Sequence, residues 1–149
     1  MPVEIVPLAD HHQARWRVLY QGYADFYRRP SDDHHKATVW GWLMDPAHEV
    51  EGYVALVDGE PQGLAHVRRM PSPLRGQDVG FLDDLFVDPE ARGHKVGEHL
   101  LAFLAGLAKA RGWPVIRWLT ADDNYRARTL YDRVASKTMW NLYEMPAED

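Results

Sequence analysis

The sequence predicts an α/β fold in which a mixed central sheet has helices on both faces. Segments with strand and helix periodicity follow one another in the order β-α-α-β-β-β-α-β-α-β. A strong hairpin signal, Asp58–Pro61, joins two neighbouring strands. A strand, a tight turn and a long amphipathic helix then follow at residues 78–111, and such a unit leads into a parallel crossover.

Each predicted element has its own signal. The strands alternate apolar and polar residues or form short apolar runs, and the helices repeat apolar residues every three or four positions. The helices begin at capping residues such as Ser31 or Asp32, and one of them ends at Gly112. The expected strands are Val3–Leu8, Tyr53–Val57, Gln62–Arg69, Asp78–Val87, Val115–Thr120 and Trp140–Met145, and the expected helices are His11–Arg28, Asp32–Met44, Lys95–Arg111 and Asn124–Ala135.

Length and composition limit the function classes. The chain has 149 residues, 46% of them hydrophobic and 26% charged, with no linker, so we expect one domain over residues 1–149. The lack of cysteine excludes disulfides, cysteine nucleophiles and thiolate metal sites. A net charge of −5 disfavours a nucleic-acid surface. With no membrane span or signal peptide in the sequence, the expected location is the cytoplasm.

The most informative segment is the turn between the strand Asp78–Val87 and the helix that follows it. Backbone N–H groups at a helix N-terminus lack intrahelical partners and carry positive potential, which favours phosphate. Gly93 allows a close backbone approach, and Gly97 removes a side chain one turn into the helix. Arg92 and Lys95 add cationic donors. A phosphate site is predicted here, although a helix cap with two surface cations is the plainer alternative.

The segment Val87–Gly97, which reads VDPEARGHKVG, resembles the acetyl-CoA signature of GNAT N-acetyltransferases, commonly V-x-P-x-x-R-G-x-G-[IV]-G. The resemblance implies a mostly antiparallel sheet of six to seven strands with about four helices, and acetyl-CoA as acyl donor. Lys95 stands where the family usually has Gly, and we expect ordinary helical backbone there. The coenzyme-binding residues implied by this segment are Leu85, Phe86, Val87, Arg92, Gly93, His94, Lys95, Val96 and Gly97.

A second segment, Thr120–Tyr131, is similar to the family's N-x-x-A-x-x-[LF]-Y motif. Asn124 is placed to cap a helix, and Ala127 and Tyr131 lie four residues apart on one face. The resemblance implies that Tyr131 is the general acid that protonates the leaving thiolate, and that Asn124 and Ala127 contact the coenzyme.

Two adjacent acids, Asp83 and Asp84, lie in the strand before the turn, in a segment (FLDDLFV) that resembles the corresponding strand of spermidine/spermine-type enzymes. A carboxylate in a central strand is costly unless it is paired or functional. A protonated amine must lose a proton before it attacks a thioester, so either acid, or a water, is a candidate base. Strand alternation predicts that only one of them faces a given cleft.

The remaining candidates are weaker. Residues that flank the predicted acceptor pocket in the resembled fold are candidate substrate contacts: Tyr23, Phe26, Tyr27, Asp32 and Asp33. Residues 32–35 (DDHH) contain possible metal ligands, but a helix start is the preferred reading and no metal is expected. The family also implies a homodimer, and the aromatic segment Trp140–Tyr143 is a candidate interface.

The expected function is transfer of acetyl from acetyl-CoA to a primary amine of a small molecule, polyamine-like or amino-acid-like. A protein-lysine or N-terminal acetyltransferase and a non-catalytic acyl-CoA-binding domain are the alternatives. The aromatic residues of the helix His11–Arg28 favour a closed small-molecule pocket. The presence of both Tyr131 and an aspartate in the strand favours an enzyme.

Overall fold

A computed structural model describes residues 2–147. These residues fall into two compact units, which are divided between Leu119 and Thr120. Each unit is described by itself. In the described part of the chain, no helix is both long and apolar enough to cross a bilayer.

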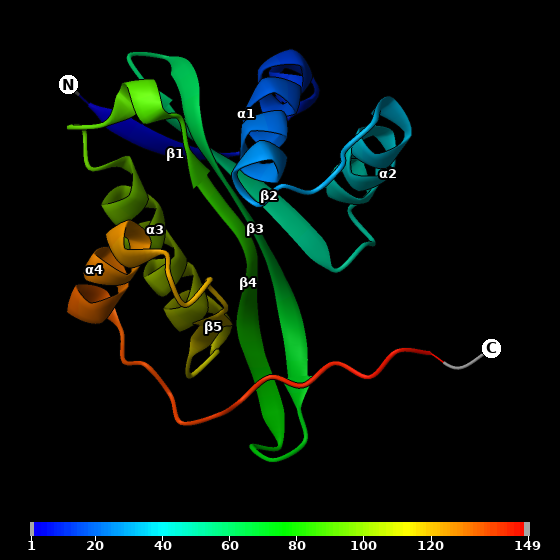
Figure 1. Cartoon of the computed structure of the whole chain (residues 1–149), viewed down its shortest axis with the longest axis vertical. Helices are drawn as coiled ribbons and strands as arrows, with labels where there is room; N and C mark the ends of the chain where they lie inside the picture. Colours follow the sequence, from blue (N-terminus) through cyan, green and yellow to red (C-terminus); the bar gives the residue numbers. More distant parts are fainter. Residues whose placement is uncertain (1, 148–149) are drawn as a thin grey trace. The chain divides into compact units, whose positions relative to one another are not determined.

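The first unit is built on a five-stranded sheet in the order β1-β2-β3-β4-β5 (Figure 1). Neighbouring strands are antiparallel from β1 to β4, and β5 runs parallel to β4. The strands are β1 (Val3–Pro7), β2 (Val50–Val57), β3 (Glu60–Ser72), β4 (Gln77–Val87) and β5 (Ile116–Trp118). The mixed α/β class predicted from the sequence is therefore confirmed.

The strand count differs from the prediction of six to seven. The predicted strand Trp140–Met145 is wrong, since residues 135–147 form no regular secondary structure. The predicted strand Val115–Thr120 is shortened to the three residues of β5. Apolar alternation is not sufficient for a strand, because the backbone N–H and C=O groups also need a neighbouring strand with which to pair.

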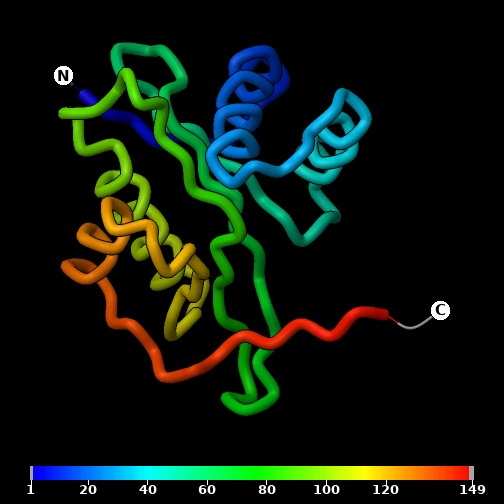
Figure 2. The backbone as a smooth tube through the Cα atoms, in the orientation of Figure 1, coloured from blue at the N-terminus to red at the C-terminus, as the bar shows by residue number. Residues whose placement is uncertain are grey.

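Two hairpins define the middle of the sheet. Between β2 and β3, Asp58 and Gly59 both adopt positive φ, 52° and 82°, as a tight two-residue turn requires. This confirms the predicted hairpin. The next hairpin is longer, and Figure 2 shows β3 and β4 side by side along its whole length. Arg68 and the other polar residues of β3 therefore lie beside β4, the strand that leads to the predicted coenzyme turn.

The helices of the first unit cover both faces of the sheet (Figure 1). Helices α1 (Gln13–Phe26) and α2 (Asp33–Met44) lie on one face, and α3 (Val96–Arg111) lies on the other. The 3-10 turns η1 (Asp10–His12) and η2 (Pro89–Ala91) precede α1 and α3. Helix α3 ends at Gly112 with φ 75°, which is the predicted glycine stop.

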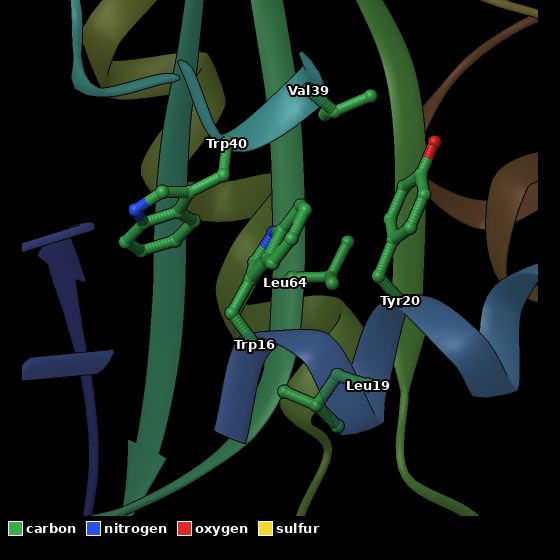
Figure 3. Packing of buried hydrophobic residues seen from close by; sticks show 6 residues of the cluster. All are labelled: Trp16, Leu19, Tyr20, Val39, Trp40 and Leu64. Carbon is green, nitrogen blue, oxygen red and sulfur yellow. The ribbon is translucent and has the colours of Figure 1, made fainter. Parts of the chain in front are cut away.

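A hydrophobic cluster attaches α1 and α2 to β3 (Figure 3). Trp16 stacks on Tyr20 with ring centroids 5.0 Å apart and packs against Trp40 at the same centroid distance. The fully buried residues of this cluster lie on the face where His66 and Phe86 also contact α1. Its buried members are Trp16, Leu19, Tyr20, Val39, Trp40 and Leu64. Large aromatic residues therefore fix α1 against the middle of the sheet.

The second unit contains one helix, α4 (Tyr125–Val134). The side chain of Asn124 accepts a hydrogen bond from the backbone N–H of Ala127 at 3.4 Å, so the predicted cap is present. Beyond the helix, the chain carries apolar side chains that are strongly exposed. They are Met139, Trp140, Leu142, Tyr143 and Met145.

Candidate functional site

The turn between β4 and α3 is open at its glycine. Gly93 has φ +95°, and a Cβ placed on it would meet no other atom within 4 Å. The first helical hydrogen bond of α3 runs from the His99 N–H to the Lys95 carbonyl at 3.0 Å, so the N–H groups of Val96 and Gly97 precede it. Among the described residues no side chain caps this helix start. The structure therefore leaves open space at Gly93, close in sequence to the N–H groups that the sequence predicts to bind phosphate.

Lys95 corrects one expectation. Its backbone is left-handed, with φ 56° and ψ 37°, and it is the N-cap of α3 instead of an ordinary helical residue. A side chain with a Cβ is strained in this conformation, whereas glycine adopts it freely. The usual Gly in the family signature is thus explained by the backbone conformation. Lys95 is exposed, so its ammonium group extends into solvent beside the turn.

Arg15 of α1 fixes the strand end that enters this turn. Its guanidinium donates to Asp88 Oδ2 at 2.6 Å, to Gln62 Oε1 at 3.0 Å and to the Pro61 carbonyl at 2.8 Å. Asp88 in turn accepts from the backbone N–H of Glu90 at 3.0 Å. The Glu90 N–H and the Arg15 guanidinium hold the pKa of Asp88 below its ordinary range. The Arg15 guanidinium therefore connects α1 to the start of η2 by an ion pair and to the β2–β3 turn region by hydrogen bonds.

One edge of β4 is free next to the turn. The parallel pairing with β5 covers only Gly80–Leu82. Beyond Leu82, β4 pairs within the described sheet only with β3, where Leu85, Phe86 and Val87 face Ala65, Leu64 and Gly63. The other edge of Leu85–Val87 thus keeps main-chain groups that can bind an extended amide ligand.

A β-bulge brings Asp83 and Asp84 to the same face of the sheet. His66 pairs with Asp84, but the next residue of β3, Val67, pairs with Leu82, so Asp83 is the extra residue. His66 and Arg68 share a face of β3 because they are two residues apart. Asp84 contacts His66 and Asp83 contacts Arg68. The expectation that only one carboxylate faces a given cleft is therefore wrong.

Asp84 is an ionised carboxylate surrounded by aromatic side chains. Its Oδ2 lies 2.7 Å from Nδ1 of the buried His66. Burial by itself would raise the pKa of Asp84, but the hydrogen bond from His66, the electrostatic attraction of His66 and a hydrogen bond from Tyr23 hold it below its ordinary range. Burial and the charge of Asp84 together raise the pKa of Tyr20 to about 12 and raise that of Tyr23 further. This face of the sheet therefore presents negative charge next to α1.

Asp83 has a different environment. Its Oδ2 accepts a hydrogen bond from Arg68 Nε at 2.9 Å, and the guanidinium carbon of Arg68 lies 4.8 Å from the centroid of the Phe81 ring. Burial raises the pKa of Asp83 despite the neighbouring Arg68. Since Arg68 compensates the charge of Asp83, Asp84 is the carboxylate of this pair without a permanent cation on it.

Comparison with known proteins agrees with this arrangement. The Acetyltransferase (GNAT) family matches residues 16–135. The chain belongs to the GNAT family of N-acetyltransferases. Members of this family use acetyl-CoA as the acyl donor, so the chain is an acetyl-CoA-dependent acyltransferase.

Among the relatives is a D-amino-acid N-acetyltransferase, HPA3 of Saccharomyces cerevisiae, which is 30% identical over 131 residues and covers 87% of this chain and 81% of its own length. A thialysine N-epsilon-acetyltransferase of Bos taurus is 28% identical over 100 residues, which is 60% of this chain and 58% of that protein. The solved structure of a probable acetyltransferase aligns with TM-score 0.85 and 26% identity over 98% of this chain and 99% of that one. The resemblance inferred from the two motifs is therefore confirmed.

The predicted acceptor contacts do not all share one environment in this GNAT domain. Tyr23 lies at the aspartates, with its hydroxyl 3.4 Å from the Asp83 carbonyl, and its ring packs edge-on against Tyr27. Phe26 is 56% exposed. Asp32 caps α2 by accepting from the His35 N–H at 2.8 Å, and Asp33 pairs with Arg17 at the surface. The interpretation of residues 32–35 as a helix start is confirmed, and both acids have structural roles in it.

The predicted residues of the second motif are carried by α4. Ala127 and Tyr131 are one turn apart on this helix, which Asn124 caps, and Asn124 also donates to Thr120 Oγ1 at 3.4 Å. This local geometry is what the GNAT motif predicted for Asn124. The roles of Tyr131 and Ala127 stay predictions.

Three residues that contact aspartates of β4 and of the turn after it were not singled out from the sequence. Arg15, His66 and Arg68 each bind a site aspartate. A signal existed for two of them: His66 and Arg68 alternate on a strand expected to form a hairpin with its neighbours, so both lie on one face. Which aspartate each of them contacts depends on the register between β3 and β4. A β-bulge changes that register without changing the apolar pattern of the sequence.

Proposed function

We propose that this chain transfers acetyl from acetyl-CoA directly to a primary amine of a small cationic molecule, either polyamine-like or amino-acid-like. The single observation that supports this acceptor class is the position of Asp84. It is an ionised, largely buried carboxylate beside Tyr20 and Tyr23, and no lysine or arginine of residues 2–147 forms an ion pair with it. An ammonium group is the complement of such a site. The relatives named for D-amino acids and thialysine act on amine groups of small molecules as well.

In this proposal the residues of the β4–α3 turn, Arg92–Gly97, hold the coenzyme phosphates, and main-chain groups of Leu85–Val87 bind the pantetheine arm. Acetyl-CoA supplies an activated acetyl thioester. Asp84 attracts the ammonium group and accepts its proton directly or through a water, while Asp83 with Arg68 shapes the same face. Tyr131 donates its phenolic proton to the departing thiolate, and Asn124 and Ala127 position that helix against the coenzyme.

Further parts of the proposal concern the whole protein. Residues 1–149 act as a single N-acetyltransferase domain in the cytoplasm. A homodimer covers the exposed apolar side chains of residues 139–145. Direct transfer requires no acyl-enzyme, which agrees with the lack of cysteine in the chain.

The test is an acetylation screen with acetyl-CoA across amine classes: polyamines, L- and D-amino acids, aminoglycosides and lysine peptides. Acetylation of free polyamines or amino acids, with much weaker acetylation of peptides, supports the proposal. Preference for lysine or N-terminal amines of peptides would instead identify a protein acetyltransferase. Calorimetric binding of coenzyme A with no acetylated product from any class would identify a non-catalytic acyl-CoA-binding domain.

A further inference from the structure

Three side chains form a continuous hydrogen-bonded line from the hydrophobic cluster to the proposed acceptor site. Trp16 Nε1 lies 3.0 Å from His66 Nε2, and His66 Nδ1 lies 2.7 Å from Asp84 Oδ2. The line crosses from α1 through β3 to β4. Trp16 is 0% exposed and His66 is 1% exposed, whereas the Asp84 side chain keeps 20% exposure. Only the aspartate end of the line is therefore accessible to a ligand.

The donor and acceptor properties of these groups allow one arrangement of protons. An indole N–H can only donate, so His66 Nε2 must accept the hydrogen bond from Trp16. The ring proton of a neutral imidazole then lies on Nδ1 and is donated to Asp84. A protonated imidazole would direct its Nε2–H against the Trp16 N–H inside a dry cluster, where an unsatisfied donor is costly.

This arrangement removes His66 from proton transfer. Its Nδ1 already carries a proton, and the lone pair of its Nε2 is occupied by Trp16. A histidine next to a reactive carboxylate is normally the first candidate for a general base, but here it has no free lone pair to offer. Its effect on Asp84 is to fix one carboxylate oxygen and to stabilise the charged form.

We propose that Trp16 and His66 are positioning residues that hold Asp84 as the ionised receptor and proton acceptor for the acceptor's ammonium group. This inference rests on the proposed function. In the step concerned, an N–H bond of the ammonium breaks, an O–H bond forms at Asp84, and the electron pair stays on nitrogen, which becomes the nucleophile. His66 gains no proton in this step, because the Trp16 N–H occupies the lone pair of its Nε2.

The arrangement also restricts the acceptor. Among the described residues, Asp84 contacts His66 and has no lysine or arginine ion-pair partner, whereas Arg68 pairs with Asp83. The site therefore favours an acceptor that carries positive charge at its reacting end. The other titratable groups that face Asp84 are Tyr20 and Tyr23 from α1, His35 from α2 and Asp83 from β4.

The direct test is nitrogen NMR of the histidine-labelled protein, with the His66 signal assigned by its loss in His66→Asn. The expected result is a ring that carries its proton on Nδ1 and none on Nε2 at the pH at which activity is measured. A ring protonated on Nε2, or an imidazolium, would overturn the proposal. This measurement needs no turnover, so it stays decisive even if the wild-type protein acetylates no amine and the proposed function fails.

A pair of variants separates positioning from packing. Asn places an amide near the position of imidazole Nδ1, and Gln places one near Nε2. His66→Asn therefore keeps a donor for Asp84, while His66→Gln keeps only the acceptor for Trp16. Loss of a charged hydrogen bond should raise the amine KM of His66→Gln about tenfold or more. The acetyl-CoA KM should not change, and His66→Asn should recover most of the loss. Equal losses in both variants would show that His66 acts through packing alone.

Trp16→Phe tests the other end of the line, because it keeps an aromatic ring and removes the N–H. Without that donor, His66 Nε2 is free to take a proton, so the pH–rate profile should gain an additional ionisation that the wild type lacks. An unchanged profile in a folded variant would contradict the role of Trp16. If Trp16→Phe does not fold, the NMR measurement and the His66 pair still decide. Trp42→Phe and His48→Gln are matched controls from a stacked Trp–His pair that is not part of this hydrogen-bonded line, and neither should alter turnover.

Discussion

The guanidinium of Arg15 on α1 lies 2.6 Å from the carboxylate of Asp88 at the end of β4. This contact joins residues 73 positions apart, and both side chains are largely shielded from solvent. Because Asp88 begins the turn that leads to Gly93, the ion pair connects the first helix to the predicted coenzyme site.

Arg15→Ala should loosen that turn. We expect the free energy of unfolding to fall by about 1–2 kcal/mol, since charged hydrogen bonds are lost from a partly shielded site. The acetyl-CoA KM should rise several-fold, with a smaller effect on the amine KM. Arg17→Ala is the matched control, because Arg17 lies on the same helix and pairs with the exposed Asp33. An acetyl-CoA KM that changes equally in both variants would contradict the role of Arg15.

Lys95→Gly should stabilise the protein, because glycine adopts the left-handed backbone of this N-cap without strain. The expected gain relative to Lys95→Ala is about 1 kcal/mol, measured by denaturant unfolding, and both variants lose the same charge. Lys109→Gly provides the opposite sign, since it places glycine within α3 and should cost about 1 kcal/mol. Equal stability of the Gly and Ala variants at position 95 would argue against strain.

Tyr131→Phe should lower kcat by about a hundredfold or more if the phenol is the general acid. Coenzyme A binding, measured by calorimetry, should persist, because the turn at Gly93 is untouched. Tyr125→Phe on the same helix is the control, since that side chain is 71% exposed, and its kcat should stay near the wild-type value. Unchanged turnover in Tyr131→Phe refutes the acid role.

The stability contributed by Asp84 should depend on pH. Its pKa in the folded protein is below that of the unfolded chain, although burial opposes this, because His66 and Tyr23 stabilise the charged form. The contribution is therefore present above the unfolded pKa and is lost as the pH falls through the folded pKa. Thermal melts of wild type and Asp84→Asn should differ at neutral pH and converge in strong acid. A difference that grows on acidification would reverse the assigned sign.

Removal of residues 138–149 tests the proposed dimer interface. The segment exposes 94% of Met139 and 87% of Tyr143, which a partner copy would cover. We expect the truncated protein to elute and scatter light as a monomer, while the full chain behaves as a dimer. Replacement of Trp140 by Ser should shift the equilibrium in the same direction. A full chain that is monomeric at all accessible concentrations would remove this proposal.

Local sequence by itself determined most of the elements and the family. Apolar spacing located the four α-helices, and the turn residues Asp58–Pro61 located the hairpin. Val87–Gly97 with Asn124–Tyr131 identified the GNAT acetyltransferase signature. Those features depend on neighbours in the chain: caps, turn residues and helix periodicity are set within a few positions. Asp58–Gly59 and Gly112 adopted the positive φ values that their residue types predict.

Only the tertiary structure decided which side chains of the candidate site contact one another. The bulge that turns Asp83 and Asp84 to one face, and the contacts of Arg15, Trp16 and His66, depend on how distant strands pair and on where α1 packs. A one-residue change in register moves every following side chain to the other face, yet it leaves the apolar pattern of each strand unaltered. Two further features also depend on the surrounding structure. The backbone of Lys95 is left-handed because of the turn that it belongs to, and Trp140–Met145 is not a strand because its backbone has no strand to pair with in the described structure.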